Sequence, residues 1–276
     1  MLSLVIALAG AIGLALALHY PADMSLPWSI ALGVLAFIGI NALINILLKK
    51  RLEAAFMVVQ NHILEKQQYL TRKINLMAGR VTPKFQAEIE AEQAQSIREA
   101  LALLDGLKSF EKWNFMVSRQ TDTIRAQFHF QLKEYELADK YFEHALLFDP
   151  LVMAMHITRL YKKGQLDKVR KMFDKGAKRF KDEKGVIIYA LYSWILVQQK
   201  DIDGAIQVLN QAKTRAESDV LKQNLENLRN GHVSRFSNAG LNDQWYALGL
   251  EAPRMQRLRA QPGFGGPGMM GGGRRR

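Results

Sequence analysis

The chain has no cysteine, and its first 48 residues contain no lysine or arginine. Without thiols it can form neither a disulfide nor a thiolate metal site, which fits a reducing compartment. The N-terminal stretch holds a single acid, Asp23, whereas the whole chain carries a formal charge of +12. All lysines and arginines therefore lie from Lys49 onward, and the two parts of the chain suit different surroundings.

Motifs for catalysis and cofactor binding are also absent. The six histidines form no H-x-x-x-H or H-E-x-x-H spacing, so no zinc site is predicted. There is no phosphate loop, no G-x-G-x-x-G following a strand and no G-x-S-x-G elbow. The sequence therefore predicts a protein that is not an enzyme, with no cofactor, no metal and no catalytic residue.

Two long apolar runs occupy the N-terminal part. Met1–Leu18 is unbroken, and Leu26–Leu48 is interrupted only by small and amide residues and by a proline at its start. A helix needs about 20 apolar residues to cross the hydrocarbon core of a bilayer, so both runs are long enough. The short polar connection carries Pro21 and Asp23, which favour a turn. Residues 1–48 are predicted to form a transmembrane helical hairpin.

A cleaved signal peptide is the alternative for the first run. Ala15 and Ala17 have the small-x-small spacing of a cleavage site, but there is no basic region before the run. Lys49, Lys50 and Arg51 follow the second run, whereas the hairpin loop has no basic residue. By the positive-inside rule the rest of the chain is expected on the cytoplasmic side of a bacterial inner membrane, anchored by more than one span.

Small and amide residues in the second run indicate how it packs. Ser29 and Gly33 form a small-xxx-small pair that lets another helix approach closely. Asn41 and Asn45 lie one turn apart, and side-chain amides in lipid seek partners. They are expected to hydrogen-bond the first span or another copy of the chain.

Residues 49–112 are predicted to be a helical linker or stalk. Apolar residues recur at helical spacing over 49–78, and Gly79 is expected to end that helix. Thr82 and Pro83 then give a capping hydroxyl followed by a proline, which predicts a second helix running to about residue 105.

The two linker helices could form a coiled-coil stalk or a hairpin that docks on the following domain. Lys66 and Lys73 fall at positions where a regular heptad seam needs apolar residues. Docking against the domain is therefore favoured over a regular coiled coil.

A pattern of small, large and small apolar residues recurs further along the chain. Its three occurrences are Ala138, Phe142 and Ala145; Val169, Phe173 and Gly176; and Ala205, Leu209 and Ala212. They start 31 and 36 residues apart, and a turn-forming stretch precedes each one: QLKEYE, KKGQLD and QQKDID. Residues three and four apart share a helix face, so each occurrence offers a second helix a close approach.

This pattern resembles the tetratricopeptide repeat, whose period is about 34 residues. The resemblance covers roughly residues 119–250, and it implies an all-α solenoid domain over residues 113–250. Residues in register with the family's packing positions are Tyr135, Ala138, Phe142, Ala145, Pro150, Ala205 and Ala212. Pro150 is expected to stop the helix that begins near Tyr135.

The resemblance also implies a peptide groove lined by the first helix of each pair. Its candidate residues are Gln120, Thr123, Gln127, Ala154, Thr158 and Trp194. Trp194 is either an anchor for a bound peptide or a residue of the helix–helix core. A further fragment, Trp245-x-x-Leu248-Gly249, has the spacing that opens a family repeat or belongs to a terminal capping helix.

Two segments are strongly basic. Residues 159–184 hold eleven lysines and arginines against four acids, and the exposed face predicted there comprises Lys162, Lys163, Lys168, Arg170, Lys171, Lys175, Lys178 and Arg179. Residues 251–276 form a Gly-, Met- and Arg-rich tail that is expected to be disordered. Each segment is either a solvated surface or a binding site for anionic lipid or nucleic acid.

Three functions are compatible with this sequence. The first is a membrane-anchored scaffold or adaptor that binds protein partners at the cytoplasmic face. The second is a polyanion-binding protein that uses the basic segments, and the third is an accessory factor of an envelope biosynthetic pathway, by analogy of layout.

Overall fold

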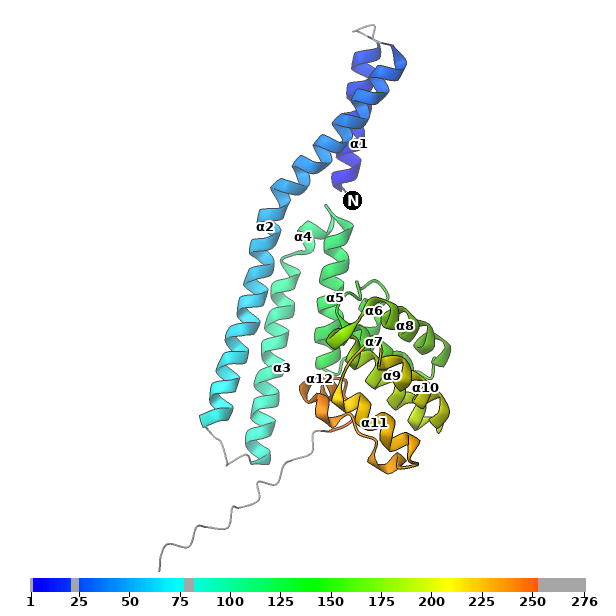
Figure 1. Ribbon diagram of the computed structural model, residues 1–276. Coiled ribbons are helices and arrows are strands. Elements are labelled where there is room, and N and C mark those ends of the chain that lie inside the picture. The colour runs from blue at the N-terminus through cyan, green and yellow to red at the C-terminus, as the bar shows by residue number, and fades with distance from the viewer. Residues whose placement is uncertain (1, 21–24, 77–81, 253–276) are drawn as a thin grey trace, which may run out of the picture.

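The computed structural model describes residues 2–20, 25–76 and 82–252, and every regular element in these ranges is a helix (Figure 1). The prediction of an all-α fold is confirmed. The N-terminal helices are α1 (Leu2–His19), α2 (Leu26–Leu76), α3 (Pro83–Asp105) and α4 (Lys108–Glu111). The later α-helices are α5 (Phe115–Gln131), α6 (Tyr135–Phe142), α7 (Pro150–Lys162), α8 (Leu166–Arg179), α9 (Val186–Gln198), α10 (Ile202–Ala212), α11 (Asp219–Arg229) and α12 (Asp243–Tyr246). The predicted loop at Pro21 and Asp23, the helix end at Gly79 and the tail from residue 253 lie outside the described residues.

Helices α1 and α2 form a hairpin held by small residues. Ala7 and Ala11 of α1 are buried, as are Ser29 and Gly33 of α2. A Cβ atom on Gly33 would lie only 3.1 Å from the Cβ of Ala15, so the helices approach as closely as the small-xxx-small pair predicts. Both helices are long and apolar enough to cross a membrane by length and composition.

The amides of the second run hydrogen-bond within the chain, but not to the first span as one of the two expectations had it. Asn45 Nδ2 donates to the carbonyl oxygen of Asn41, 2.9 Å away, within α2 itself. Asn114, between α4 and α5, donates from its Nδ2 to Asn45 Oδ1 at 3.3 Å. Among the described residues, the hydrogen bonds of these amides therefore lie within α2 or join α2 to Asn114, and none reaches α1.

The second run and the first linker helix are one continuous helix, because α2 extends without a break from Leu26 to Leu76. Helix α3 packs antiparallel to its second half, and its first residues are capped as expected, with Thr82 Oγ1 accepting from the backbone N–H of Phe85. A separate apolar core joins these helices to α5 and comprises Val59, Ala100, Leu104, Leu107 and Phe128. Figure 1 shows α2, α3 and α5 running side by side, with α6 to α11 to one side of them.

The lysines that interrupt the heptad pattern meet acids on α3. Lys73 pairs with Glu88 at 2.7 Å and with Glu92, and Lys66 lies 3.4 Å from Glu99. Opposite charges at the seam let the two helices run antiparallel without a continuous apolar heptad. The part of α2 from Lys49 onward together with α3 is called the stalk below. The apolar core that it shares with α5 shows that the stalk docks on the helices that follow, as the sequence favoured.

Three helix pairs follow the stalk: α5 with α6, α7 with α8, and α9 with α10. Each pair turns through a residue with positive φ, namely Lys133 at 62°, Gly164 at 70° and Lys200 at 64°. After each of these residues, the next backbone N–H donates to a carbonyl five residues earlier, as in a Schellman motif: Glu134 to His129, Gln165 to Leu160 and Asp201 to Leu196. The three predicted turns are thus one structural turn used three times.

Replacing Gly164 by alanine should lower the free energy of unfolding by about 0.5–1 kcal/mol, because a left-handed conformation strains any residue with a Cβ. Nothing lies within 4 Å of the position that this Cβ would take, so crowding would not contribute. Gly39 has equally open surroundings but stands inside a helix, so Gly39→Ala is the control. Chemical unfolding of the full chain in detergent measures both; equal effects would contradict the role of the turn.

The repeated small-large-small positions are buried in the core, except for Ala145, which is partly buried. Ala138, Phe142, Val169, Phe173, Ala205, Leu209 and Ala212 are all buried. A Cβ on Gly176 would be 2.9 Å from Met153 Sδ and 3.1 Å from Ile188 Cγ2, so α7 and α9 approach α8 closely at this glycine. Tyr135 is partly buried at the start of α6, where its ring packs edge-on against Phe130.

Ala145 packs against the repeat core as predicted, but not from the expected helix, and the prediction that Pro150 stops that helix was wrong. Helix α6 ends at Phe142, so Ala145 lies in the loop beyond it, and Pro150 begins the next helix instead of stopping this one. Asp149 caps α7 by accepting from the backbone N–H of Val152 at 2.9 Å. The loop leaves the helical path because the backbone N–H of Leu146 donates to Thr123 Oγ1 on α5, 2.8 Å away.

The C-terminal part of the described chain folds back on the repeats. Helix α11 packs on α9 and α10, and the chain then passes through two short 3-10 helices to α12. Trp245 lies in this helix of four residues and is fully buried. The Trp245 fragment therefore does not open a further helix pair within the described residues.

Candidate functional site

The inner face predicted to bind a peptide is built by α5, α7 and α9. Ala154 and Thr158 of α7 were expected to line it, but both have 0% of their surface exposed and lie inside the repeat core. A peptide on this structure cannot contact them. The remaining candidates fall into two groups, one around Trp194 and one along α5.

Trp194 is partly buried and packs against residues of the same chain. Its indole Nε1 donates to Glu251 Oε1 at 2.8 Å, and its ring packs edge-on against Tyr161 and Trp245, with centroids 5.8 and 5.9 Å away. The other carboxylate oxygen of Glu251 accepts from Trp245 Nε1 at 2.9 Å. Of the two interpretations left open for Trp194, these contacts support the core residue.

Residues 236–251, called the closing segment below, cover the inner side of α9 and the end of α7. Asn238 Nδ2 donates to the carbonyl oxygen of Ala190 at 3.0 Å, and Lys162 Nζ donates to that of Gly249 at 3.2 Å. Trp245 and Leu248 are fully buried in the repeat core. The part of the inner face nearest the C-terminus is therefore filled by the chain itself.

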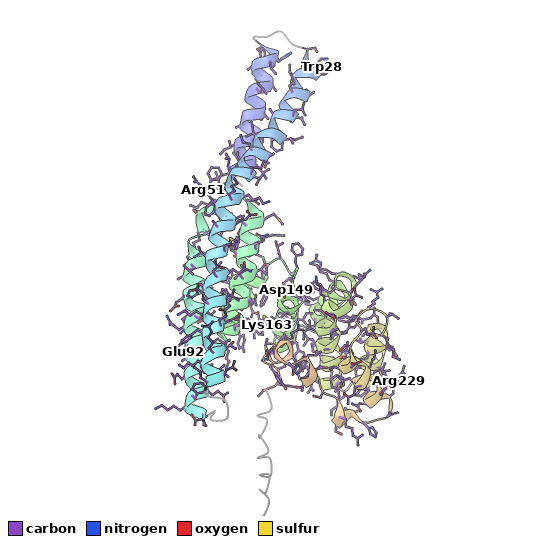
Figure 2. All side chains as sticks on the ribbon, turned by 60° about the vertical axis from the view of Figure 1, so that its left-hand side comes forward. Trp28, Arg51, Glu92, Asp149, Lys163 and Arg229 are labelled. Atoms are coloured by element: carbon purple, nitrogen blue, oxygen red, sulfur yellow. The ribbon has the colours of Figure 1, made fainter. Side chains whose placement is uncertain are left out.

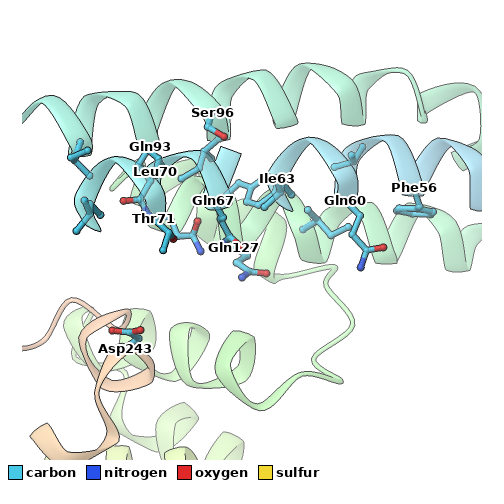
Figure 3. Close-up of a pocket in the computed structure, with 17 residues that line it drawn as sticks. Phe56, Gln60, Ile63, Gln67, Leu70, Thr71, Gln93, Ser96, Gln127 and Asp243 are labelled. Atoms are coloured by element: carbon cyan, nitrogen blue, oxygen red, sulfur yellow. The ribbon is translucent and has the colours of Figure 1, made fainter. Parts of the chain in front are cut away.

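The inner side of α5 remains open and faces the stalk across a cleft of 870 Å³ (Figure 3). Gln127 of the predicted groove lines this stalk cleft. The cleft is lined by Phe56, Val59, Gln60, Ile63, Gln67, Leu70, Thr71, Ile74, Ile89, Gln93, Ser96, Ile97, Ile124, Gln127, Phe128, Gln131 and Asp243. Figure 3 shows Asp243 on the opposite side of the cleft from the α2 side chains.

The other two α5 candidates lie beside a neighbouring hollow. Gln120 and Thr123 line a space of 350 Å³ together with Phe56 of the stalk and Phe148 of the α6–α7 loop. Gln120 is exposed, but the Thr123 hydroxyl is held by the loop through Leu146. The structure thus brings Gln120, Thr123 and Gln127 to the stalk side of α5, away from Trp194.

The chemistry of the stalk cleft is apolar and amide-rich. Aliphatic and aromatic side chains provide its walls, and five glutamines offer both hydrogen-bond donors and acceptors. Asp243 is the one charged side chain among the lining residues. Such a surface suits a polypeptide segment with apolar and uncharged polar side chains better than it suits a polyanion or a charged metabolite. The sequence pattern that could have indicated this cleft is the set of glutamines placed between apolar residues in both stalk helices.

The predicted basic residues divide into two sets. Lys163 pairs with Asp139 at 2.8 Å, Lys162 binds the closing segment, and Arg179 donates to the carbonyl oxygen of Leu147 at 2.8 Å. The other members lie exposed on α8, and no ion pair is recorded for them within the described part of the chain: Lys168, Arg170, Lys171, Lys175 and Lys178. These five residues form the basic face of the repeats.

A partly buried histidine, His156, lies between the basic face and the core. Burial lowers the pKa of His156 to about 4, and the nearby cations Lys163 and Lys168 act in the same direction, while Asp139 and Glu143 oppose them. Its ring packs edge-on against Phe142 with centroids 4.9 Å apart. His156 is therefore neutral at neutral pH, and it must gain a proton when the protein unfolds in mild acid.

This protonation predicts a pH dependence of stability. A histidine whose pKa is lowered by folding contributes stability that is complete above its unfolded pKa of about 6.5 and is lost as the pH falls toward 4. We expect the free energy of unfolding to drop by about 2 kcal/mol between pH 7 and pH 5. Chemical unfolding at both pH values should show that the free energy of unfolding falls clearly less in His156→Leu than in the wild-type protein. An equal fall in both proteins would show that other groups cause the pH dependence.

The site also contains a buried charge that the sequence did not single out. Arg125 of α5 has only 6% of its side chain exposed and donates to Glu111 Oε1 of α4 at 2.8 Å. Its Nη2 lies 3.4 Å from the carbonyl oxygen of Leu104 at the end of α3. One side chain thus ties α5 to both the stalk and α4.

Among the described residues, no group of three or more histidines and acids could hold a metal ion.

Comparison with known proteins identifies one of the three helix pairs. Residues 123–150 match the family model of the tetratricopeptide repeat. The match begins within α5, includes all of α6 and ends at Pro150. No curated protein and no solved structure matches the chain. The repeat is typical of protein-interaction scaffolds, and the match supports the resemblance of this helix pair to the tetratricopeptide-repeat superfamily.

Proposed function

We propose that this protein is a membrane-anchored scaffold that binds a protein partner in the stalk cleft, on the cytoplasmic side of the membrane. In this proposal residues 1–48 are the membrane hairpin, 49–112 the linker, 113–250 the repeat domain and 251–276 a basic tail. The observation that carries the proposal is the open stalk cleft beside α5, with its apolar and amide-rich lining, in a repeat domain whose remaining inner face is filled by the closing segment.

Two features support the proposed topology. The basic residues Lys49, Lys50 and Arg51 follow the apolar part of α2, which by the positive-inside rule puts the stalk in the cytoplasm. At the same end of the hairpin, the backbone N–H of Leu2 donates to the carbonyl oxygen of Lys112 at 2.9 Å. This bond joins α1 to residues 112–114, called the α4–α5 junction below. Such a contact is compatible with both ends of the hairpin on the same side of the membrane.

Site-specific photocrosslinking in membranes tests the proposal. A photoreactive residue at Gln67 or Gln127 in the stalk cleft should yield the same protein adduct, and Gln93→Arg, which puts a charge into the cleft, should remove it. The same probe at Gln207, an exposed glutamine of α10, is the control and should yield none. Adducts of equal strength from Gln207 and from the cleft would contradict a partner site at the stalk.

A polyanion-binding function is the second candidate, and the basic face on α8 favours it. Charge contacts weaken as salt screens them, whereas the binding of a partner in the apolar, amide-rich cleft should respond little to salt. A probe at Lys171 therefore separates the two candidates. Adducts from Lys171 alone, lost at raised salt, would favour the basic face over the stalk cleft.

A further inference from the structure

A second, smaller pocket lies where the stalk meets the membrane hairpin. It has a volume of 220 Å³ and lies between α2 and the α4–α5 junction. The pocket is lined by Asn45, Leu48, Lys49, Leu52, Phe110, Asn114 and Val117. None of these residues belongs to the stalk cleft.

The position of this pocket along α2 is set by the sequence. The apolar run ends at Leu48, and Lys49, Lys50 and Arg51 follow directly. Figure 2 shows Trp28 at the far end of the hairpin and Arg51 where the hairpin joins the stalk, so the pocket lies at the boundary between lipid tails and headgroups if the hairpin spans the membrane.

The α4–α5 junction is held at this level by hydrogen bonds to both helices of the hairpin. Ser3 Oγ of α1 donates to the carbonyl oxygen of Trp113 at 2.7 Å, and Asn114 Nδ2 donates to Asn45 Oδ1 of α2 at 3.3 Å. The wall that Phe110 and Val117 give to the pocket is therefore fixed relative to the apolar run. Trp113, an amphipathic side chain of the kind enriched at membrane interfaces, lies in the same junction.

The lining divides into an apolar part and a polar rim. Leu48, Leu52, Phe110 and Val117 supply the apolar part. Lys49 supplies a cation whose side chain is 71% exposed; its ion pair with Glu53 is long at 3.6 Å and exposed, so it holds the ammonium group only weakly. A ligand that matches this arrangement has an apolar chain next to a negative group.

We propose that this pocket binds an anionic phospholipid, with part of an acyl chain against Leu52, Phe110 and Val117 and the phosphate at Lys49. The proposal rests on the membrane anchoring proposed above. A free phosphate would leave the apolar part empty, and a zwitterionic lipid would bring its own cation close to the lysine, so a lipid with a net negative charge matches the site best. A lipid bound here would contact α2 and the α4–α5 junction together and would fix the angle between the stalk and the bilayer.

Native mass spectrometry of the full chain tests this proposal. The protein is released from nanodiscs that contain equal amounts of phosphatidylglycerol and phosphatidylcholine with the same acyl chains. We expect preferential retention of phosphatidylglycerol. Lys49→Gln should reduce this preference about fivefold, since a lysine near an anionic membrane surface contributes about 1 kcal/mol. Lys168→Gln, the same change on the basic face of α8, should leave it unaltered.

Filling the pocket provides a second, independent variant. Leu52→Trp should reduce retention of both lipids, whereas Leu47→Trp, a position 65% exposed on the same helix, should not. Equal retention of the two lipids by the wild-type protein, or wild-type retention by correctly folded Leu52→Trp, would overturn the proposal. Carbonate extraction of membranes distinguishes a failure of the membrane anchoring from a failure of the lipid site. A chain that is extracted refutes the membrane anchoring, whereas a chain that stays inserted without lipid preference refutes only the lipid site.

Discussion

Replacing Trp245 by alanine is expected to lower the free energy of unfolding by about 3–5 kcal/mol, the cost of truncating a large buried aromatic side chain. Trp245 has 0% of its surface exposed, packs against Trp194 and donates its indole N–H to Glu251. Its loss would open a cavity in the repeat core and leave one oxygen of Glu251 without this partner. Urea unfolding of the full chain in detergent measures the effect.

Trp28→Ala is the matched control, because Trp28 is 67% exposed at the far end of the hairpin and should cost little in detergent. Trp194→Ala should also destabilise the protein while leaving the Gln67 and Gln127 adducts in place in the folded fraction. A Trp194→Ala protein of normal stability that loses those adducts would contradict the interpretation of Trp194 as a core residue packed against the closing segment. It would instead support Trp194 as an anchor for the partner.

The helix pairs could be predicted from the sequence because their determinants are local. Spacings of three and four residues place Ala138 and Phe142 on one buried face, and Gly164 allows the left-handed turn between two helices. Thr82 and Pro83 marked the start of α3 for the same reason. Each of these features depends on residues within one or two helical turns.

The filled inner face could not be predicted in this way. Trp194 and Glu251 are 57 residues apart, and no periodic pattern links an indole to a distant carboxylate. The family resemblance implied an open groove, so Ala154 and Thr158 were assigned to a surface that the structure buries. Pro150 was misassigned because a proline can end one helix or begin the next, and the bond between Leu146 and Thr123 decides between them.

The stalk cleft could be predicted from the sequence only in part. The glutamines of α2 and α3 were visible in the sequence, but their common direction follows from the docking of the stalk on α5. Helix α5 has two buried faces: Ala126 and Phe130 belong to the repeat core, and Phe128 belongs to the stalk core. This helix therefore connects the proposed partner site to the repeats, and its attachment to the stalk determines the shape of the cleft.

Arg125 is the residue of α5 on which this attachment should depend most. Arg125→Ala is expected to lower the free energy of unfolding by about 3–5 kcal/mol, because it leaves the carboxylate of Glu111 partly buried without its cation. Arg170→Ala, on the exposed face of α8, removes the same charge and should change stability by less than about 0.5 kcal/mol. Urea unfolding of both variants in detergent measures the difference.

The Arg125 variant also tests whether the stalk and the repeats act together. Arg125 contacts Leu104 at the end of α3 and Glu111 in α4, so its loss should loosen the stalk from α5 before it disturbs α7 to α10. Hydrogen exchange should then rise in α3 and α4 and stay low in α9, and the Gln127 adduct should weaken in protein that is still folded. Uniform exchange across all helices would show that Arg125 stabilises the whole fold and does not specifically hold the cleft in shape.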